Sequence, residues 1–105
     1  MKRPNVILIL ADDLGQTDIS LYGNKIVSTP NIDGIGRRGA TFTEGYISSP
    51  VCSPSRAGLI TGRYQQRFGF DNNPGAAQRD DTSFGLPRDR LTLPERLKTR
   101  GYATG

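Results

Sequence analysis

The fold is decided by the stretch Val6-Ile7-Leu8-Ile9-Leu10, a continuous apolar run rich in β-branched residues. Such a run is typical of a strand buried on both faces, as in a parallel sheet covered by helices. The polar turn Ala11-Asp12-Asp13-Leu14-Gly15 follows it directly. Ligands of open α/β sheets collect at the carboxyl ends of the strands, so this turn is a candidate binding site.

Three later segments carry helix start signals, namely a serine or threonine within two residues of a proline, and each is followed by a glycine that can end the helix. The predicted helices cover residues 30–38, 53–61 and 93–100. Thr92 and Glu95 also have the spacing of a capping box. Residues 40–46 and 102–105 are predicted as a strand and the start of another, whereas residues 64–90 are predicted as a long surface excursion.

This order of elements is that of an α/β protein. We therefore predict the N-terminal part of a mostly parallel sheet flanked by helices, incomplete within the 105 residues. The low hydrophobic share, 34%, and the 13 glycines agree with a fold that needs more polypeptide.

Composition narrows the classes of function. The net charge of +4 comes without a basic block, so nucleic-acid binding is not favoured. No apolar stretch is long enough to span a membrane, and the apolar run after Met1 is too short for a signal peptide. We expect a cytoplasmic protein as written, or a periplasmic or secreted one if an upstream signal has been lost. One cysteine excludes an internal disulfide, and the lack of histidine removes the commonest general acid–base residue.

The most informative segment is CSPSRAGLITGR, residues 52–63. Pro54 and Ser55 place Cys52 just before a helix N-terminus, where unpaired N–H groups and the helix dipole favour negative charge. Arg56 lies in the first turn and can reach the same point. A lone cysteine can equally be a small buried hydrophobe, and a lone arginine a solvated surface charge.

The whole string closely resembles the signature of the sulfatase family, in which Cys-X-Pro-Ser-Arg is followed by an apolar helix ending in Thr-Gly-Arg. Residues 4–15 resemble the opening of the same family. Further similar segments, in the same order, are 29–33, 92–94 and 101–105. The resemblance is weakest across residues 64–90.

The resemblance implies an alkaline phosphatase/sulfatase-like fold and a set of site residues. Cys52 would be oxidised by a separate maturation enzyme to Cα-formylglycine, whose hydrate carries and then expels the sulfate. Asp12 and Asp13 would bind Ca²⁺ or Mg²⁺, with the modified Cys52 as a further ligand, and Arg56 would stabilise the oxyanion. From the residues alone Asp12-Asp13 could be a solvated turn, although a divalent cation relieves the repulsion between adjacent carboxylates.

By the same resemblance, residues 1–105 are the N-terminal portion of a sulfatase catalytic domain, a sulfuric ester hydrolase of the arylsulfatase type. Its substrate would be a sulfated small molecule or glycan. Later segments of the family supply a lysine, histidines and an Asp–Asn pair that are absent from this chain. We therefore expect the isolated chain to be inactive and loosely folded.

Three other functions remain open at this point. A phosphonate or phosphate monoester hydrolase of the same superfamily can share the modified cysteine and the metal site. A non-catalytic fragment would keep an unmodified cysteine. A hydrolase with a cysteine nucleophile is poorly supported, because no histidine is present to act as a base.

Overall fold

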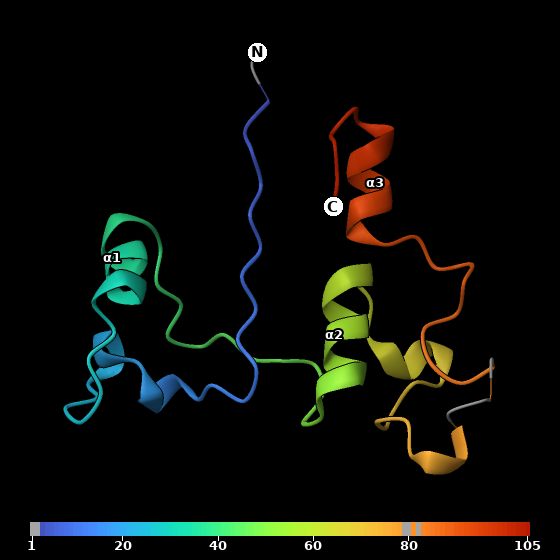
Figure 1. The fold of residues 1–105 in the computed structure, drawn as a ribbon, viewed down its shortest axis with the longest axis horizontal. Coiled ribbons are helices and arrows are strands. Elements are labelled where there is room, and N and C mark those ends of the chain that lie inside the picture. Colours follow the sequence, from blue (N-terminus) through green and yellow to red (C-terminus); the bar gives the residue numbers. More distant parts are fainter. Residues whose placement is uncertain (1–2, 79–80, 82) are drawn as a thin grey trace. The chain divides into compact units, whose positions relative to one another are not determined.

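The structure is a computed structural model that describes residues 3–78, 81 and 83–105. The chain divides into two compact units, Met1–Gly45 and Tyr46–Gly105. The first contains the 3₁₀ helices η1 (Gln16–Asp18) and η2 (Ser20–Tyr22) and the helix α1 (Pro30–Arg38). The second contains the helices α2 (Cys52–Thr61) and α3 (Leu93–Thr99) and the 3₁₀ helices η3 (Gln65–Phe68) and η4 (Ala76–Gln78) (Figure 1).

Helix α1 confirms the helix predicted between Thr29 and Gly39, which are its N-cap and C-cap. Its anchor is Asp33, a residue that is only 5% exposed. The Asp33 carboxylate accepts hydrogen bonds from Ser20 Oγ at 2.7 Å, Leu21 N at 3.0 Å and Thr29 Oγ1 at 2.7 Å. Asp33 thereby joins η2 to the first turn of α1.

Helix α2 confirms the helix predicted before Gly62, which ends it in the left-handed region at φ 66°. Cys52 is the first residue of this helix. The prediction that Cys52 lies just before the helix is therefore wrong. Helix α3 confirms the third predicted helix but ends at Thr99, with Arg100 as its C-cap.

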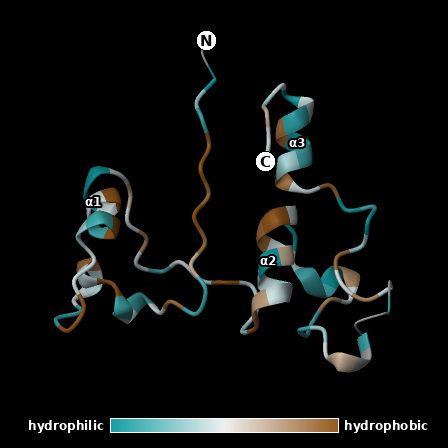
Figure 2. Ribbon diagram, viewed as in Figure 1, coloured by the Kyte–Doolittle hydropathy of each residue, from teal (hydrophilic) through white to brown (hydrophobic). Residues whose placement is uncertain are grey.

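The predicted sheet is not confirmed, since no residue in the described parts of either unit lies in a strand. The expectation that Val6–Leu10 is buried on both faces is wrong for this chain, because these five residues are 45–83% exposed. Figure 2 shows them as a brown, extended segment. A strand needs a neighbouring strand for its N–H and C=O groups, and the described chain offers none.

The strand predicted over residues 40–46 is likewise absent, as is the strand start at 102–105. Phe42 is 73% exposed, and its carbonyl accepts a hydrogen bond from the hydroxyl of Tyr22 at 2.9 Å. Residues around Phe42 therefore form a loop tied to η2. An apolar side chain beside threonines is a strand pattern only where a partner strand is available.

The prediction of a surface excursion over residues 64–90 is wrong in part. Gln65 has no exposed surface and Phe70 is only 6% exposed. The ring of Phe70 meets that of Phe84 edge-on, with the centroids 5.6 Å apart. This segment therefore supplies part of the core of the second unit. Residues 79, 80 and 82 of the excursion lie outside the described residues.

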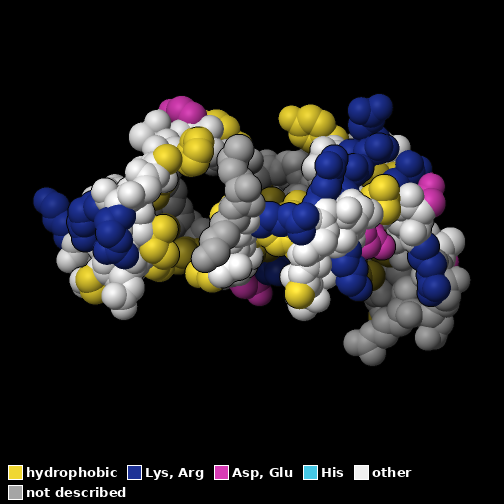
Figure 3. Space-filling model, turned by 90° about the horizontal axis from the view of Figure 1, so that it is seen from above, with side chains coloured by type: hydrophobic (Ala, Val, Ile, Leu, Met, Phe, Trp, Pro, Cys, Tyr) yellow, Lys and Arg dark blue, Asp and Glu magenta, His cyan; other side chains and the backbone are white. Residues whose placement is uncertain are grey.

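Within the described residues, no helix combines the length and the apolar character needed to cross a bilayer. On the face drawn in Figure 3, lysine and arginine side chains form separate groups, and hydrophobic side chains reach the surface in both units. Large exposed side chains include Ile26 at 95%, Tyr46 at 85% and Ile47 at 71%. The units leave much apolar surface in contact with solvent.

Candidate active site at the start of helix α2

Helix α2 presents one buried face and one exposed face. Pro54, Ala57, Gly58 and Thr61 are buried, with the spacing of one side of a helix. Cys52 and Arg56 are exposed and lie four residues apart, so they share the opposite side of the first turn. The structure therefore brings together the two predicted catalytic residues.

The N-terminus of α2 has no cap from its own N-cap residue. Val51 occupies that position in an extended conformation and carries no side-chain oxygen. The acceptor for the N–H of Ser53 is Oδ1 of Asn73, at 2.9 Å. The first turn of this helix is thus capped by a residue far along the chain.

Asn73 also contacts the cysteine itself. Its Nδ2 lies 3.1 Å from Cys52 Sγ and its Oδ1 lies 3.5 Å from the same sulfur. The sequence does not predict Asn73 as a site residue. Asn72-Asn73-Pro74-Gly75 has the composition of a turn, and nothing in it signals a contact with a residue so distant in sequence.

The predicted metal ligands Asp12 and Asp13 lie in the other unit, in a bend that follows the apolar run. Both are exposed, and Asp13 adopts a left-handed backbone at φ 53°. Aspartate tolerates this region better than most residues do, but a strained turn beside a second carboxylate is typical of functional loops.

The donor chemistry of Asp12 and Asp13 fits a hard divalent cation, which prefers carboxylate oxygens. Calcium takes 6–8 oxygen ligands, more than two carboxylates supply. The described residues contain no group of three or more His, Cys, Asp or Glu side chains able to hold a metal. Asp12 and Asp13 can therefore supply two of the ligands of a metal site, and further ligands are needed to complete it.

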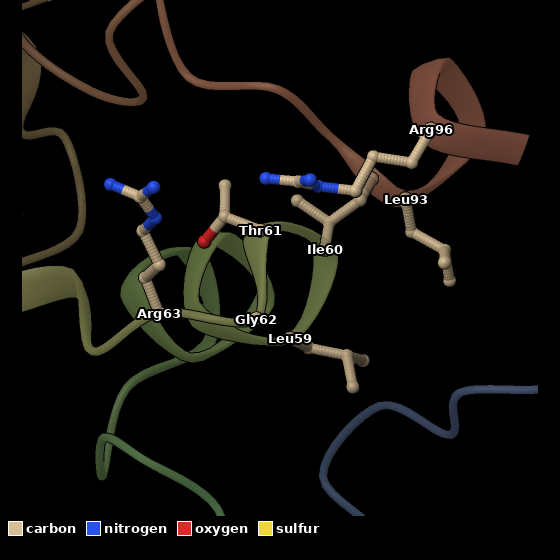
Figure 4. A pocket seen from close by; sticks show the side chains of 7 residues that line it. All are labelled: Leu59, Ile60, Thr61, Gly62, Arg63, Leu93 and Arg96. Carbon is tan, nitrogen blue, oxygen red and sulfur yellow. The ribbon is translucent and has the colours of Figure 1, made fainter. Parts of the chain in front are cut away.

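A pocket of about 340 Å³ lies elsewhere in the second unit, at the opposite end of α2 from Cys52. It is lined by the last turn of α2 and the first turn of α3, with Leu59, Ile60 and Leu93 beside Arg63 and Arg96 (Figure 4). Neither Cys52 nor Arg56 lines it. The pocket is therefore separate from the candidate active site.

An exposed thiol at a helix N-terminus, with an arginine one turn away, forms a place suited to an anionic group. The family model described as Sulfatase matches residues 4–105. The chain therefore belongs to the sulfatase family.

Individual relatives agree with this family. The chain is 44% identical to Arylsulfatase D of Homo sapiens over 105 residues, covering 98% of this chain and 18% of that protein. It is 45% identical to Steryl-sulfatase of Homo sapiens over 104 residues, covering 97% and 18%. Among the curated relatives it matches, the chain spans about a fifth of their length, as with the 20% of Arylsulfatase A of Bos taurus.

A solved structure shows the same fold over this region. The structure titled "Crystal structure of Ps i-CgsB" matches with a TM-score of 0.85 and 41% sequence identity. The match covers 99% of this chain and 22% of that chain.

Proposed function

We propose that this chain is the N-terminal portion of a sulfatase catalytic domain and that the complete enzyme hydrolyses a sulfate ester. The observation that carries the proposal is the exposed pair Cys52 and Arg56 on the first turn of α2, within a chain that the Sulfatase family matches over residues 4–105. The substrate in this proposal is a sulfated small molecule or glycan, and the sulfatase family of the chain supports this choice.

Cys52 is the precursor of the nucleophile in this proposal. Its conversion to Cα-formylglycine by a maturation enzyme supplies a hydrate with two hydroxyl groups, one to accept the sulfate and one to expel it. The exposure of Cys52 supports this role, because a maturation enzyme must reach the side chain.

Arg56 binds and neutralises the sulfate. Its guanidinium offers several N–H donors with fixed geometry, and charge-assisted bonds of this kind are about twice as strong as neutral ones. The dipole of α2 adds positive potential at the same place. These groups hold and orient the sulfate beside position 52, and any part of their interaction that strengthens in the transition state lowers the barrier.

Asp12 and Asp13 bind Ca²⁺ or Mg²⁺ in this proposal, and an oxygen of the modified Cys52 is a third ligand. Held by these aspartates, a divalent cation would supply Lewis-acid chemistry, which would polarise a sulfate oxygen and favour ionisation of the attacking hydroxyl. Support comes from the adjacent carboxylates and from the family of the chain. Replacing either aspartate should abolish metal-dependent turnover.

The test uses the complete polypeptide, co-expressed with a formylglycine-generating enzyme. Mass spectrometry of the tryptic peptide that spans residues 39–56 measures conversion of Cys52, and release of 4-nitrophenol from 4-nitrophenyl sulfate measures turnover. Cys52→Ala, Asp12→Asn and Asp13→Asn should each lose activity. Asp89→Asn is the matched control, because Asp89 is an exposed carboxylate with 69% of its side chain accessible.

Other outcomes would change the assignment. Undiminished hydrolysis in Asp12→Asn or Asp13→Asn would refute the metal site. Faster turnover of the matched phosphate or phosphonate ester would instead identify a monoester hydrolase of the same superfamily. An intact thiol after co-expression, with no turnover, would identify a non-catalytic chain.

A further inference from the structure

We propose that Asn73 is a positioning residue that fixes the orientation of the side chain at position 52. Its effect on turnover rests on the proposed function, but its effect on the geometry of Cys52 does not. Asn73 comes from the segment between η3 and η4, outside the part of the sequence that carries the catalytic motif.

The hydrogen bonds determine which way the amide of Asn73 points. The backbone N–H of Ser53 can only donate, so the atom 2.9 Å from it must be the carbonyl oxygen Oδ1. The amide nitrogen Nδ2 is therefore the end that donates to Cys52 Sγ, at 3.1 Å. One planar group thus holds both the backbone of the first turn and the reactive side chain.

Within residues 3–78, 81 and 83–105, the N–H of Ser53 and the sulfur of Cys52 are both bonded to Asn73, a residue distant in sequence. Helix α2 has no side-chain hydrogen bond from its N-cap residue, since Val51 is apolar. The N–H of Ser55 is bonded to the carbonyl of Val51 at 3.2 Å, as in an ordinary first turn. Asn73 therefore satisfies the N–H of Ser53 and supplies a hydrogen bond to the side chain at 52.

The segment that carries Asn73 is itself anchored. Gln65 is fully buried, with its Nε2 3.0 Å from the carbonyl of Ser48 and its Oε1 2.9 Å from the hydroxyl of the same residue. Gly69 then turns the chain in the left-handed region at φ 71°. Phe70 is buried edge-on against Phe84. Asn73 follows Phe70 by three residues, so its backbone starts from a fixed point.

The donor is better matched to the converted residue than to the thiol. Sulfur is a weak acceptor, whereas a hydroxyl or carbonyl oxygen accepts an amide N–H strongly. The side chain at 52 exchanges sulfur for oxygen when the cysteine becomes formylglycine. The contact with Nδ2 is therefore worth more in the mature protein than in the precursor.

The main experiment separates capping from positioning in the complete, matured polypeptide. Asn73→Asp keeps an oxygen acceptor for the N–H of Ser53 and removes only the Nδ2 donor, whereas Asn73→Ala removes both. We expect both variants to lower kcat about tenfold, the effect of one lost hydrogen bond, with KM changed less than about twofold. Asn72→Asp is the matched control, because it places the same charge on the neighbouring exposed residue.

Rates are divided by the fraction of Cys52 converted, measured by mass spectrometry, so that a maturation defect is not counted as slow chemistry. If Asn73→Asp keeps wild-type kcat while Asn73→Ala does not, Asn73 is only a helix cap and the proposal fails. If the wild-type protein hydrolyses no sulfate ester, the proposed function fails, and a second measurement decides the role of Asn73.

That measurement is alkylation of Cys52 by iodoacetamide in the same polypeptide made without the maturation enzyme. In Asn73→Asp the sulfur loses a hydrogen-bond donor and faces a carboxylate, so alkylation should slow about tenfold. The control Asn72→Asp should react at the wild-type rate. Equal rates in Asn73→Asp and the wild type would overturn the proposal independently of any hydrolytic activity.

Discussion

Asp33 shows how one buried carboxylate can organise a small unit. Burial raises the pKa of Asp33, but hydrogen bonds from Ser20, Thr29 and the backbone of Leu21, together with the charge of Arg37, lower it by more. The net pKa therefore lies below the ordinary value of 3.8. The nitrogen Nη2 of Arg37 is 3.6 Å from the carboxylate, but its side chain is 60% exposed, so solvent weakens this ion pair.

The first prediction concerns the pH dependence of this anchor. Because the pKa is lower in the folded than in the unfolded chain, ionised Asp33 stabilises α1 and η2 above pH 3.8, and the stabilisation is lost as the pH falls through the folded value. NMR titration of the Asp33 carboxyl carbon should give a pKa below 3.8. Asp33→Asn should remove the pH dependence of amide protection at Leu21; an unchanged profile would contradict this account.

The second prediction compares two helical glycines. A Cβ at Gly58 would lie 2.5 Å from Ser48 Oγ and 3.0 Å from Gln65 Oε1, so Gly58→Ala must disrupt the buried bonds of Gln65. We expect it to destabilise the complete protein by about 1–3 kcal/mol, as overpacking does. A Cβ at Gly34 meets only the flexible end of Arg38, at 3.1 Å.

Gly34→Ala is the matched control for this pair. It should stabilise the protein by up to about 1 kcal/mol, the difference in helix propensity between glycine and alanine. Urea denaturation of the two variants and the wild type measures both effects. A stabilising Gly58→Ala would show that the space beside Gln65 is larger than the structure indicates.

At the scale of elements, the helices could be predicted from sequence because their signals are local. Thr29 with Pro30, and Thr92 with Glu95, mark helix starts within one turn, and the structure begins α1 and α3 there. The strands could not be confirmed in the same way. Val6–Leu10 has the composition of a strand, but a strand exists only when another segment pairs with it.

The same difference between local and long-range contacts applies to the residues of the candidate site. Cys52 and Arg56 are close because one helical turn separates them, and this follows from the sequence. Asn73 reaches the cysteine only because Phe70 and Gln65 fix the intervening loop, and no local pattern encodes that tertiary contact. Residues 64–90 contain few apolar residues, so the sequence pattern does not indicate which positions among them are buried.

The third prediction concerns the start of α3. The backbone N–H and hydroxyl of Thr92 donate to Glu95 Oε2 at 2.7 and 2.8 Å. These bonds lower the pKa of Glu95 below 4.5, and Lys98 adds to the effect. The ionised carboxylate therefore stabilises the helix start above pH 4.5, and this support is lost as the pH falls through the folded value.

Replacing the carboxylate tests this capping contribution directly. Glu95→Ala should increase hydrogen exchange at the first amides of α3 at neutral pH, and the exchange of the wild type should approach that of the variant at acidic pH after correction for intrinsic rates. Arg100→Ala, at the other end of α3, is the control and should leave those amides unchanged. Equal protection in Glu95→Ala and the wild type would show that packing, not the cap, holds this turn.

At the scale of the whole molecule, the hydrophobic core is too small for the chain. Among the described residues only Ala57 and Phe70 are buried hydrophobic side chains, whereas Val6–Leu10 and many other apolar residues are exposed. Domains are stable by a small margin, and burial of apolar surface supplies most of it. The relatives are about five times longer, since this chain spans 18% of Arylsulfatase D.

The last prediction follows from this imbalance. Residues 1–105 alone should show no cooperative thermal transition and should bind the dye ANS, because apolar segments such as Val6–Leu10 are exposed within the described chain. They should also hydrolyse no arylsulfate, even with Cys52 converted, because the described residues hold no group of three or more candidate metal ligands and the chain contains no histidine. The complete polypeptide under the same conditions is the control and should unfold cooperatively. A cooperative transition together with measurable hydrolysis by the isolated chain would show that residues 1–105 are a self-sufficient enzyme, and that the exposed run is covered by rearrangement within the chain itself.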